Sequence, residues 1–261
     1  MLSLEDLPFE LLMHIHLMSL SPALPNLSRH LRSVFAATSP RHCAQYLTLR
    51  HEHKTLAHAI KYPICSLEVV HALERLAQER GKKLKCSNLP RRLVKGLGKS
   101  GSKDDDVDLP LITYLLDKYG ATPNSHDGYP LARAVFARHL PLIRLLLHHG
   151  ANPALKDGWA VTTAIANGDV DLVKLLMERE VDRGDADGPL QEVVLQPREG
   201  KSAKKRRRDS GGGGGKRRCM GDRCRATKEM LETAVKAKQW AIVDYLTAKG
   251  AQPSLSVLAM L

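Results

Sequence analysis

A short cassette recurs along this chain of 261 residues, and its period limits the fold more than any other feature. Each copy carries aliphatic residues at helical spacing and then the sequence Gly-Ala-x-Pro. Complete endings stand at 120–123, 150–153 and 250–253, while a fourth aliphatic stretch, at 172–176, has Glu180 in place of the glycine. The first two glycines are 30 residues apart. A fixed period of this size indicates a stack of repeated supersecondary units.

Each cassette has an upstream half with its own helical pattern. An aliphatic residue lies 12 positions before the later stretch in three copies, at Leu131, Val161 and Leu231, and an alanine follows each three positions on. That spacing places both residues on one face of a helix. A glycine after a helix is a common left-handed cap, and a proline cannot continue the helix. The sequence therefore predicts two short antiparallel helices per unit, which must stack to bury their apolar faces.

These units resemble the ankyrin family. The residues that carry the resemblance are Pro130, Leu131 and Ala134 of the Thr-Pro-Leu-His-x-Ala signature, Gly-Ala-Asn-Pro at 150–153, and Asp157 with Gly158. The resemblance implies an all-α, ankyrin-type helix-pair solenoid that binds proteins, over residues 51–187 with a terminal repeat at 230–261. We count five units, two of them degenerate: one lies around 67–73, and the next is interrupted by polar residues 98–108.

Composition limits the remaining classes of protein. Aromatic residues make up only 4% of the chain, so the core must be aliphatic. No apolar run approaches the roughly 20 residues of a membrane span, and the first residues lack the positive charge of a secretory signal. Five scattered cysteines in such a chain favour an intracellular protein with reduced thiols.

The sequence contains no recognisable catalytic constellation. The five glycines at 211–215 lack the Lys-Ser/Thr and helix start of a phosphate-binding loop, so we expect neither an enzyme nor a cofactor. Cys219 and Cys224 alone cannot complete a tetrahedral zinc site. The paired histidines, His14 with His16 and His148 with His149, are expected at the surface, so no metal is predicted.

Most of the positive charge lies in one segment. Residues 198–228 hold thirteen Lys and Arg and three acidic residues, a net +10 of the chain's +12. The segment has no aliphatic periodicity, and we predict a disordered basic linker at 188–229. Its clusters have the spacing of a bipartite nuclear-import signal: Lys204, Lys205, Arg206, Arg207 and Arg208, then Lys216, Arg217 and Arg218. Nonspecific nucleic-acid binding through phosphates and a merely solvated loop are the alternatives to an importin-type receptor in the nucleus.

Residues 1–50 form a distinct N-terminal segment. Apolar residues from Phe9 to Leu20 cover nearly the whole circumference of a predicted helix, which must then be buried on two sides. A second helix is expected at about 25–35. The opening resembles an F-box, the module that docks on the Skp-type adaptor of cullin-RING ubiquitin ligases. Its matching residues are Leu7, Pro8, Glu10, Leu11, Leu12 and Ile15.

Two interpretations of this segment stay open. The combination of an F-box-like module with repeats is similar to fungal-type F-box/ankyrin proteins and implies a substrate-recognition adaptor with a Skp-type partner and a protein target. Solenoids also need caps on their apolar ends, so residues 1–50 could serve only as a cap of a nuclear ankyrin scaffold. Exposed first-helix and loop residues would hold the target, whose identity the sequence does not give.

Overall fold

The computed structural model describes residues 4–51, 55–98, 107–178 and 222–253. Within these ranges it contains thirteen α-helices, two short 3-10 helices and no β-strand. The predicted all-α class is confirmed for this part of the chain. The basic clusters at 204–208 and 216–218, and most of the linker predicted at 188–229, lie outside the described residues.

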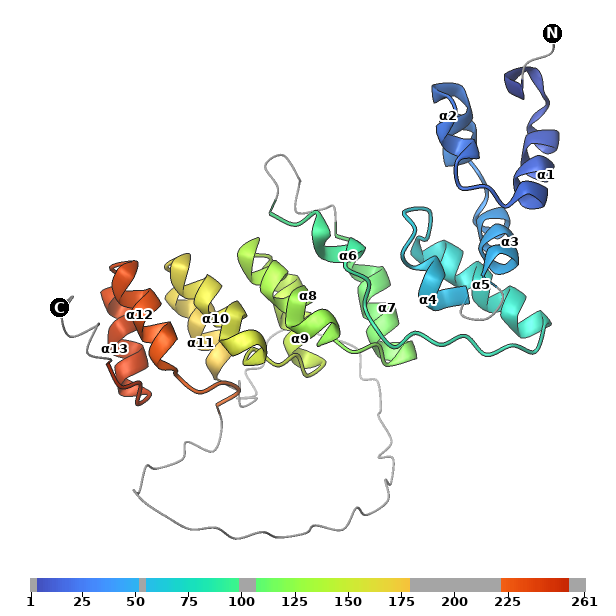
Figure 1. The fold of residues 1–261 in the computed structure, drawn as a ribbon. Coiled ribbons are helices and arrows are strands. Elements are labelled where there is room, and N and C mark those ends of the chain that lie inside the picture. The colour runs from blue at the N-terminus through green and yellow to red at the C-terminus, as the bar shows by residue number, and fades with distance from the viewer. Residues whose placement is uncertain (1–3, 52–54, 99–106, 179–221, 254–261) are drawn as a thin grey trace, which may run out of the picture.

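The helices follow the expected order of an N-terminal segment and then five pairs (Figure 1). The N-terminal elements are η1 (Leu4–Asp6), α1 (Phe9–Ser19), η2 (Leu24–Asn26), α2 (Arg29–Ala36) and α3 (Pro40–Arg50). The pairs are α4 (Thr55–Ala59) with α5 (Leu67–Glu79), α6 (Arg92–Lys95) with α7 (Leu109–Tyr119), α8 (Ser125–Phe136) with α9 (Leu140–His148), α10 (Leu155–Ala166) with α11 (Val170–Met177), and α12 (Lys228–Lys236) with α13 (Trp240–Ala248). The short α4 and α6 mark the two degenerate units.

The second helix of most pairs begins with the same device. A side chain at the N-cap accepts a hydrogen bond from the backbone N–H three residues later, which satisfies one of the free amides of the first turn. The capping residues, with their distances, are Ser66 (3.5 Å), Asp108 (3.1 Å), His139 (3.1 Å) and Asp169 (3.2 Å). The repeated cap shows that four of the five pairs share one local geometry.

The predicted glycine caps end three of the second helices. Gly120, Gly150 and Gly250 all have positive φ, and the amide of Ala151 donates to the carbonyl of Leu146 at 2.9 Å. The helix α11, which lacks the glycine, ends instead at Glu178 in an extended conformation. Glu178 forms an antiparallel bridge with Asp222. The residues on either side of 179–221 therefore lie next to each other.

The first helices α8 and α10 open with a left-handed turn. His126, Asp127 and Gly128 all have positive φ, as do the three residues ending at Gly158. Regular helix starts only after each glycine. A Cβ added at Gly158 would overlap the methyl carbon of Met230 in the next unit. The left-handed backbone favours glycine there, and a methyl group at this position would also force the end of the Met230 side chain to move.

The buried apolar residues fall into two clusters. The larger one runs through all five pairs, from Ala44 in α3 to Ala251 after α13. The smaller one belongs to the N-terminal hairpin and consists of Leu12, Met13, Leu24, Leu31 and Phe35. Helix α3 packs on α5, so it covers the open end of the first pair, while α1 and α2 have their own core.

Two expected boundaries differ in the structure. Helix α2 begins at Arg29 rather than near residue 25, because the Ser28 side chain caps it by accepting from Leu31 N–H at 3.1 Å. The described part of the last unit begins at Asp222, and α12 starts at Lys228 rather than at residue 230. Cys224 is buried in the repeat core, so it is not the linker residue that the sequence predicts.

Neighbouring second helices are joined by polar contacts at one repeated position. In three second helices, a basic residue near the C-terminus, ten positions after the N-cap residue of the same helix, contacts an acidic residue of the preceding unit. The contacts are Lys118 Nζ to Glu74 Oε2 (2.8 Å), His149 Nε2 to Asp117 Oδ1 (3.3 Å) and Lys249 Nζ to Glu178 Oε1 (3.0 Å). His149 is therefore engaged in a contact between units, which was not expected from the sequence.

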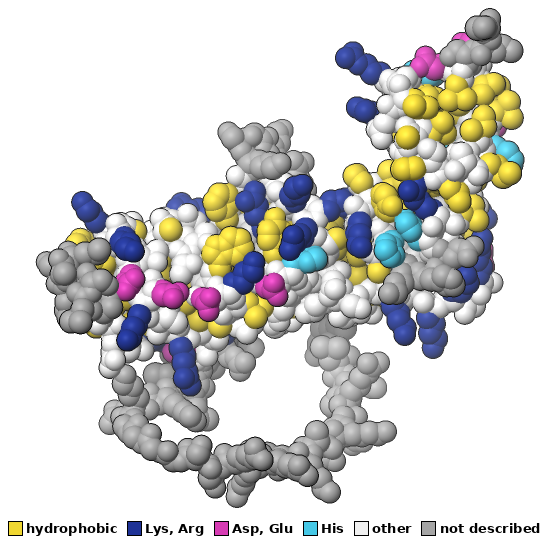
Figure 2. All heavy atoms as spheres, in the orientation of Figure 1, with side chains coloured by type: hydrophobic (Ala, Val, Ile, Leu, Met, Phe, Trp, Pro, Cys, Tyr) yellow, Lys and Arg dark blue, Asp and Glu magenta, His cyan; other side chains and the backbone are white. Residues whose placement is uncertain are grey.

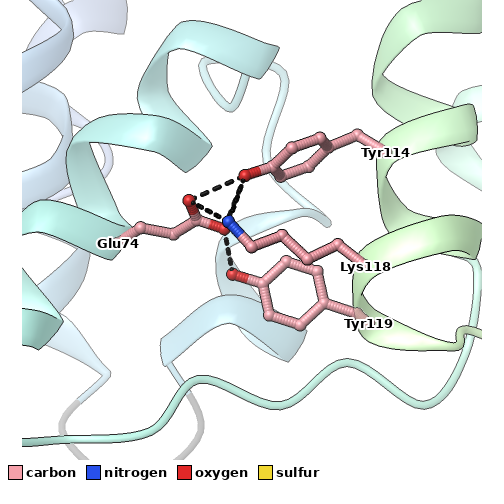
Figure 3. A network of polar contacts seen from close by, with 4 residues as sticks. All are labelled: Glu74, Tyr114, Lys118 and Tyr119. Carbon is pink, nitrogen blue, oxygen red and sulfur yellow. Dashed lines mark hydrogen bonds and ion pairs between the residues drawn. The ribbon is translucent and has the colours of Figure 1, made fainter. Parts of the chain in front are cut away.

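Glu74 on α5 receives most of the polar contacts from α7 (Figure 3). The hydroxyl of Tyr114 donates to its carboxylate at 2.7 Å, the hydroxyl of Tyr119 at 2.5 Å, and the Lys118 ammonium at 2.8 Å. Burial disfavours the charge of this carboxylate, but the hydrogen bonds from Lys118, Tyr119 and Tyr114 together hold the pKa of Glu74 below its ordinary value. This network links the first two units.

Candidate interaction surfaces

The six F-box-like residues do not share one environment. Leu12 is only 1% exposed and lies in the core of the N-terminal hairpin. Leu7 and Ile15 pack against that core, whereas Pro8 and Glu10 are exposed. Leu11 is 51% exposed. Only some of the six could therefore contact a partner, and Leu11 is the clearest apolar one.

An apolar strip along one side of α1 faces solvent. Met18, seven positions after Leu11, lies on the same side of α1 and is 76% exposed. Phe9 and Leu27 are also exposed. Hydrophobic side chains gather on this module in the space-filling view (Figure 2). Phe9, two positions before Leu11, lies on the opposite side of the helix, so we call Leu11 and Met18 alone the α1 surface.

His16 is buried between α1, α2 and α3. Its ring stacks on Tyr46 with centroids 4.1 Å apart, and it also meets Phe35 and His42. Burial, reinforced by the nearby His42 and Arg50, lowers the pKa of His16 to about 4. The expectation of a surface residue was wrong for His16, although its place four residues after Leu12 was a signal of burial.

Arg50 fixes α1 to α3. Its guanidinium donates to the backbone carbonyl of Leu20 and to the hydroxyl of Tyr46, both at 2.7 Å. Leu20 is the left-handed residue that ends α1. These bonds hold the carboxyl end of α1 against the helix that covers the solenoid.

A second surface runs along the first helices of the middle units. Tyr129, Arg133 and Phe136 lie at helical spacing on the solvent side of α8, and Trp159 occupies the place of Tyr129 in α10. Phe136 is 52% exposed and Trp159 is 44% exposed. We call this set, with Arg91 and Lys156, the first-helix surface. In Figure 2, Lys and Arg side chains alternate with hydrophobic ones over these helices.

Cations stand over each aromatic ring of the first-helix surface. The distances from cation to ring centroid are 5.4 Å for Arg91 over Tyr129, 4.9 Å for Arg133 over Phe136 and 5.4 Å for Lys156 over Trp159. Such pairs hold flat apolar faces and positive charge side by side. The sequence predicts binding by exposed first-helix residues but does not single these out. A usable signal was that Tyr129 and Trp159 each follow an Asp-Gly pair.

Neither a metal-binding group nor an accessible thiolate is found among the described residues. They hold no group of three or more His, Cys, Asp or Glu side chains that could bind a metal ion. Burial raises the pKa of the Cys65 thiol to about 12 and that of Cys86 to about 11, so these thiols stay protonated. No described helix combines the length and the apolar character that crossing a membrane requires.

Comparison with known families identifies one unit of the stack. The ankyrin-repeat family matches residues 129–158, from Tyr129 through α9 to the Asp-Gly turn of the next unit. No curated protein and no solved structure matched the chain. Residues 129–158 are thus an ankyrin repeat, which supports a role in binding other proteins.

Proposed function

We propose that this chain is a protein-interaction adaptor. Its N-terminal module would dock on a Skp-type adaptor of a cullin-type ubiquitin ligase, while the repeats hold a protein target. The observation that carries the proposal is the α1 surface, an apolar face on a hairpin that has its own core. Exposed apolar patches on folded modules mark interaction sites, and Leu11 of the F-box-like motif lies within this one.

The arrangement of α3 favours this function over a simple cap. Helix α3 already covers the first pair by packing on α5, and its Ala44 and Leu47 are part of the repeat core. Capping therefore needs α3 but not the exposed side of α1. The alternative is a nuclear scaffold without a ligase link, and the capping of the first pair by α3 is the one feature that supports it.

Replacing Leu11 with aspartate is expected to abolish binding of a Skp-type adaptor without unfolding the chain. The side chain is half exposed, so the charge would be solvated in the free protein but buried in the complex. Co-expression with a Skp-type adaptor and size-exclusion chromatography measures the complex. Ile64→Asp, at an exposed apolar position of the repeats, is the matched control. If the unmodified chain does not elute with the adaptor, the ligase link fails.

We further propose that the basic clusters at 204–208 and 216–218 direct nuclear import. Glutamine at all eight positions is expected to move a fluorescent fusion from the nucleus to the cytoplasm, because import receptors read Lys and Arg side chains of extended segments. Imaging of both fusions in one cell line measures this. An unchanged nuclear signal contradicts import. DNA binding that falls steeply with salt, and is lost in the glutamine variant, would instead indicate phosphate binding.

A further inference from the structure

The cations of the first-helix surface lack acidic partners. In the part of the chain that the structure describes, no carboxylate lies within ion-pair distance of Arg91, Arg133 or Lys156. The Nε of Arg133 is buried and has no hydrogen-bond acceptor. The side-chain amide nitrogen of Asn167, at the end of α10, is also buried without an acceptor. These two atoms are closed to solvent, so the unpaired charges of the three cations are what a partner would meet.

The exposed aromatic side chains of this surface indicate that a partner also brings apolar groups. Phe136 and Trp159 expose about half of their surface although they belong to the central units. Gly98 lies so close to the ring of Phe136 that an added Cβ would come within 2.9 Å of it. The ring is therefore held in place on one side and open on the other. Rigid exposed aromatics beside arginines are typical of the residues that dominate binding at interfaces.

Acidic residues stand along the edge of this surface. Asp127 and Asp157 are exposed in the turns that precede α8 and α10. In α12 the place of Tyr129 and Trp159 is taken by Glu229, so the aromatic and basic character ends there. Figure 2 shows a row of Asp and Glu side chains below the mixed basic and hydrophobic region. A partner with a negative charge on every unit would meet this edge along its whole length, whereas a segment whose carboxylates are separated by apolar side chains can place them over the cations. The basic segment of this chain would meet the like charges of the surface.

We propose that the first-helix surface binds an extended protein segment in which Asp or Glu residues alternate with apolar side chains. The carboxylates pair with Arg91, Arg133 and Lys156, one in each of three successive units. The apolar side chains pack on Tyr129, Phe136 and Trp159. This partner class rests on the proposed role of the repeats as the part that holds the target, and it is independent of the ligase link.

Selection from a displayed library of random 14-residue peptides tests the proposal. The bait is the full chain with glutamine at 204–208 and 216–218, so that the basic clusters do not capture acidic peptides. Parallel selections use the same bait carrying Trp159→Ala or Arg133→Ala. Matched controls carry Trp240→Ala, which removes an exposed aromatic of α13, or Arg75→Ala, which removes an exposed cation of α5. Circular dichroism confirms that every bait is folded.

The enriched peptides are expected to alternate acidic and apolar residues, and to bind the Trp159→Ala and Arg133→Ala baits at least tenfold more weakly. The control baits should keep full affinity in fluorescence anisotropy. Basic or uncharged consensus peptides, no enrichment, or equal loss in the controls would overturn the proposal. Tighter binding of a 14-nucleotide single strand that depends on Trp159 would overturn it in favour of nucleic acid. None of these outcomes bears on adaptor binding through Leu11, which is measured separately.

Discussion

Replacing Glu74 with alanine is expected to lower the free energy of unfolding by about 2–3 kcal/mol. The change leaves the hydroxyls of Tyr114 and Tyr119 and the Lys118 ammonium without their shared acceptor. Tyr114 and Tyr119 are half-buried at the contact between α5 and α7, where a lost partner is not fully replaced by water, whereas Lys118 is half exposed and contributes less. A surface ion pair would contribute much less.

Glu74→Ala should weaken most the contact between the first two units. Besides the Glu74 network, that contact includes Arg92, which donates to the carbonyls of Ile60 and Cys65 at 3.2 Å each. The stability of a solenoid is approximately a sum of unit terms and nearest-neighbour interface terms. Weakening one interface should therefore separate unfolding into two steps, with the N-terminal part lost first.

Urea unfolding followed by circular dichroism measures this change. Glu68→Ala is the control, because Glu68 is an exposed carboxylate in the first turn of the same helix. The control should lose less than about 0.5 kcal/mol, as is usual for surface substitutions. Equal losses for Glu74→Ala and Glu68→Ala would show that the network does not stabilise the stack.

The same network predicts a dependence on pH. The pKa of Glu74 is lower in the folded protein than its ordinary 4.5, so the unfolded chain binds the proton more readily. Its contribution to stability is complete above pH 4.5 and is lost as the pH falls through the folded pKa. Glu74→Gln should reduce the loss of stability between pH 5 and 3, measured by thermal unfolding. An identical pH profile for both proteins would contradict this role.

Gly158→Ala is expected to destabilise the protein by about 2–4 kcal/mol, which combines a strained left-handed backbone with overpacking. The residue has φ +76, and the new methyl group would overlap Met230 of the next unit. Met230 is fully buried, so the end of its side chain has to repack within the contact between α10 and α12. The last unit should therefore be the part that loosens.

Gly150→Ala separates the two contributions. Gly150 has a similar φ of +83, but no atom lies within 4 Å of its added Cβ. Gly150→Ala should lower the free energy of unfolding only through strain of the left-handed backbone, by about 1–2 kcal/mol. Thermal and urea unfolding of both variants measure the difference. If Gly150→Ala costs as much as Gly158→Ala, the close approach to Met230 contributes nothing.

The helix pairs could be predicted because their signals are local. The aliphatic spacing around Leu131 and Ile143 and the glycine at 150 determine two helices and a cap within one unit. The ankyrin-repeat match covers this same unit. Local signals also failed where they were read too coarsely: Ser28 is a strong N-cap residue, and it places the start of α2 after the predicted one.

Features that depend on distant contacts could not be predicted. The burial of His16 depends on Tyr46 and His42 in another helix, and the bridge from Glu178 to Asp222 joins residues on either side of 179–221. The role of α3 as the cover of the first pair depends on its packing on α5. Of the F-box-like residues, the sequence could not separate the exposed Leu11 from the buried Leu12. The import clusters stay a prediction.

The central claim is that one chain carries two separable protein-binding surfaces. Affinity purification from cells, quantified by mass spectrometry, tests it with the unmodified chain, Leu11→Asp and Trp159→Ala in parallel. Leu11→Asp should lose the Skp-type adaptor and keep the proteins bound by the repeats, whereas Trp159→Ala should lose those proteins and keep the adaptor. Loss of both classes in either variant, or of neither class in both, would contradict the account.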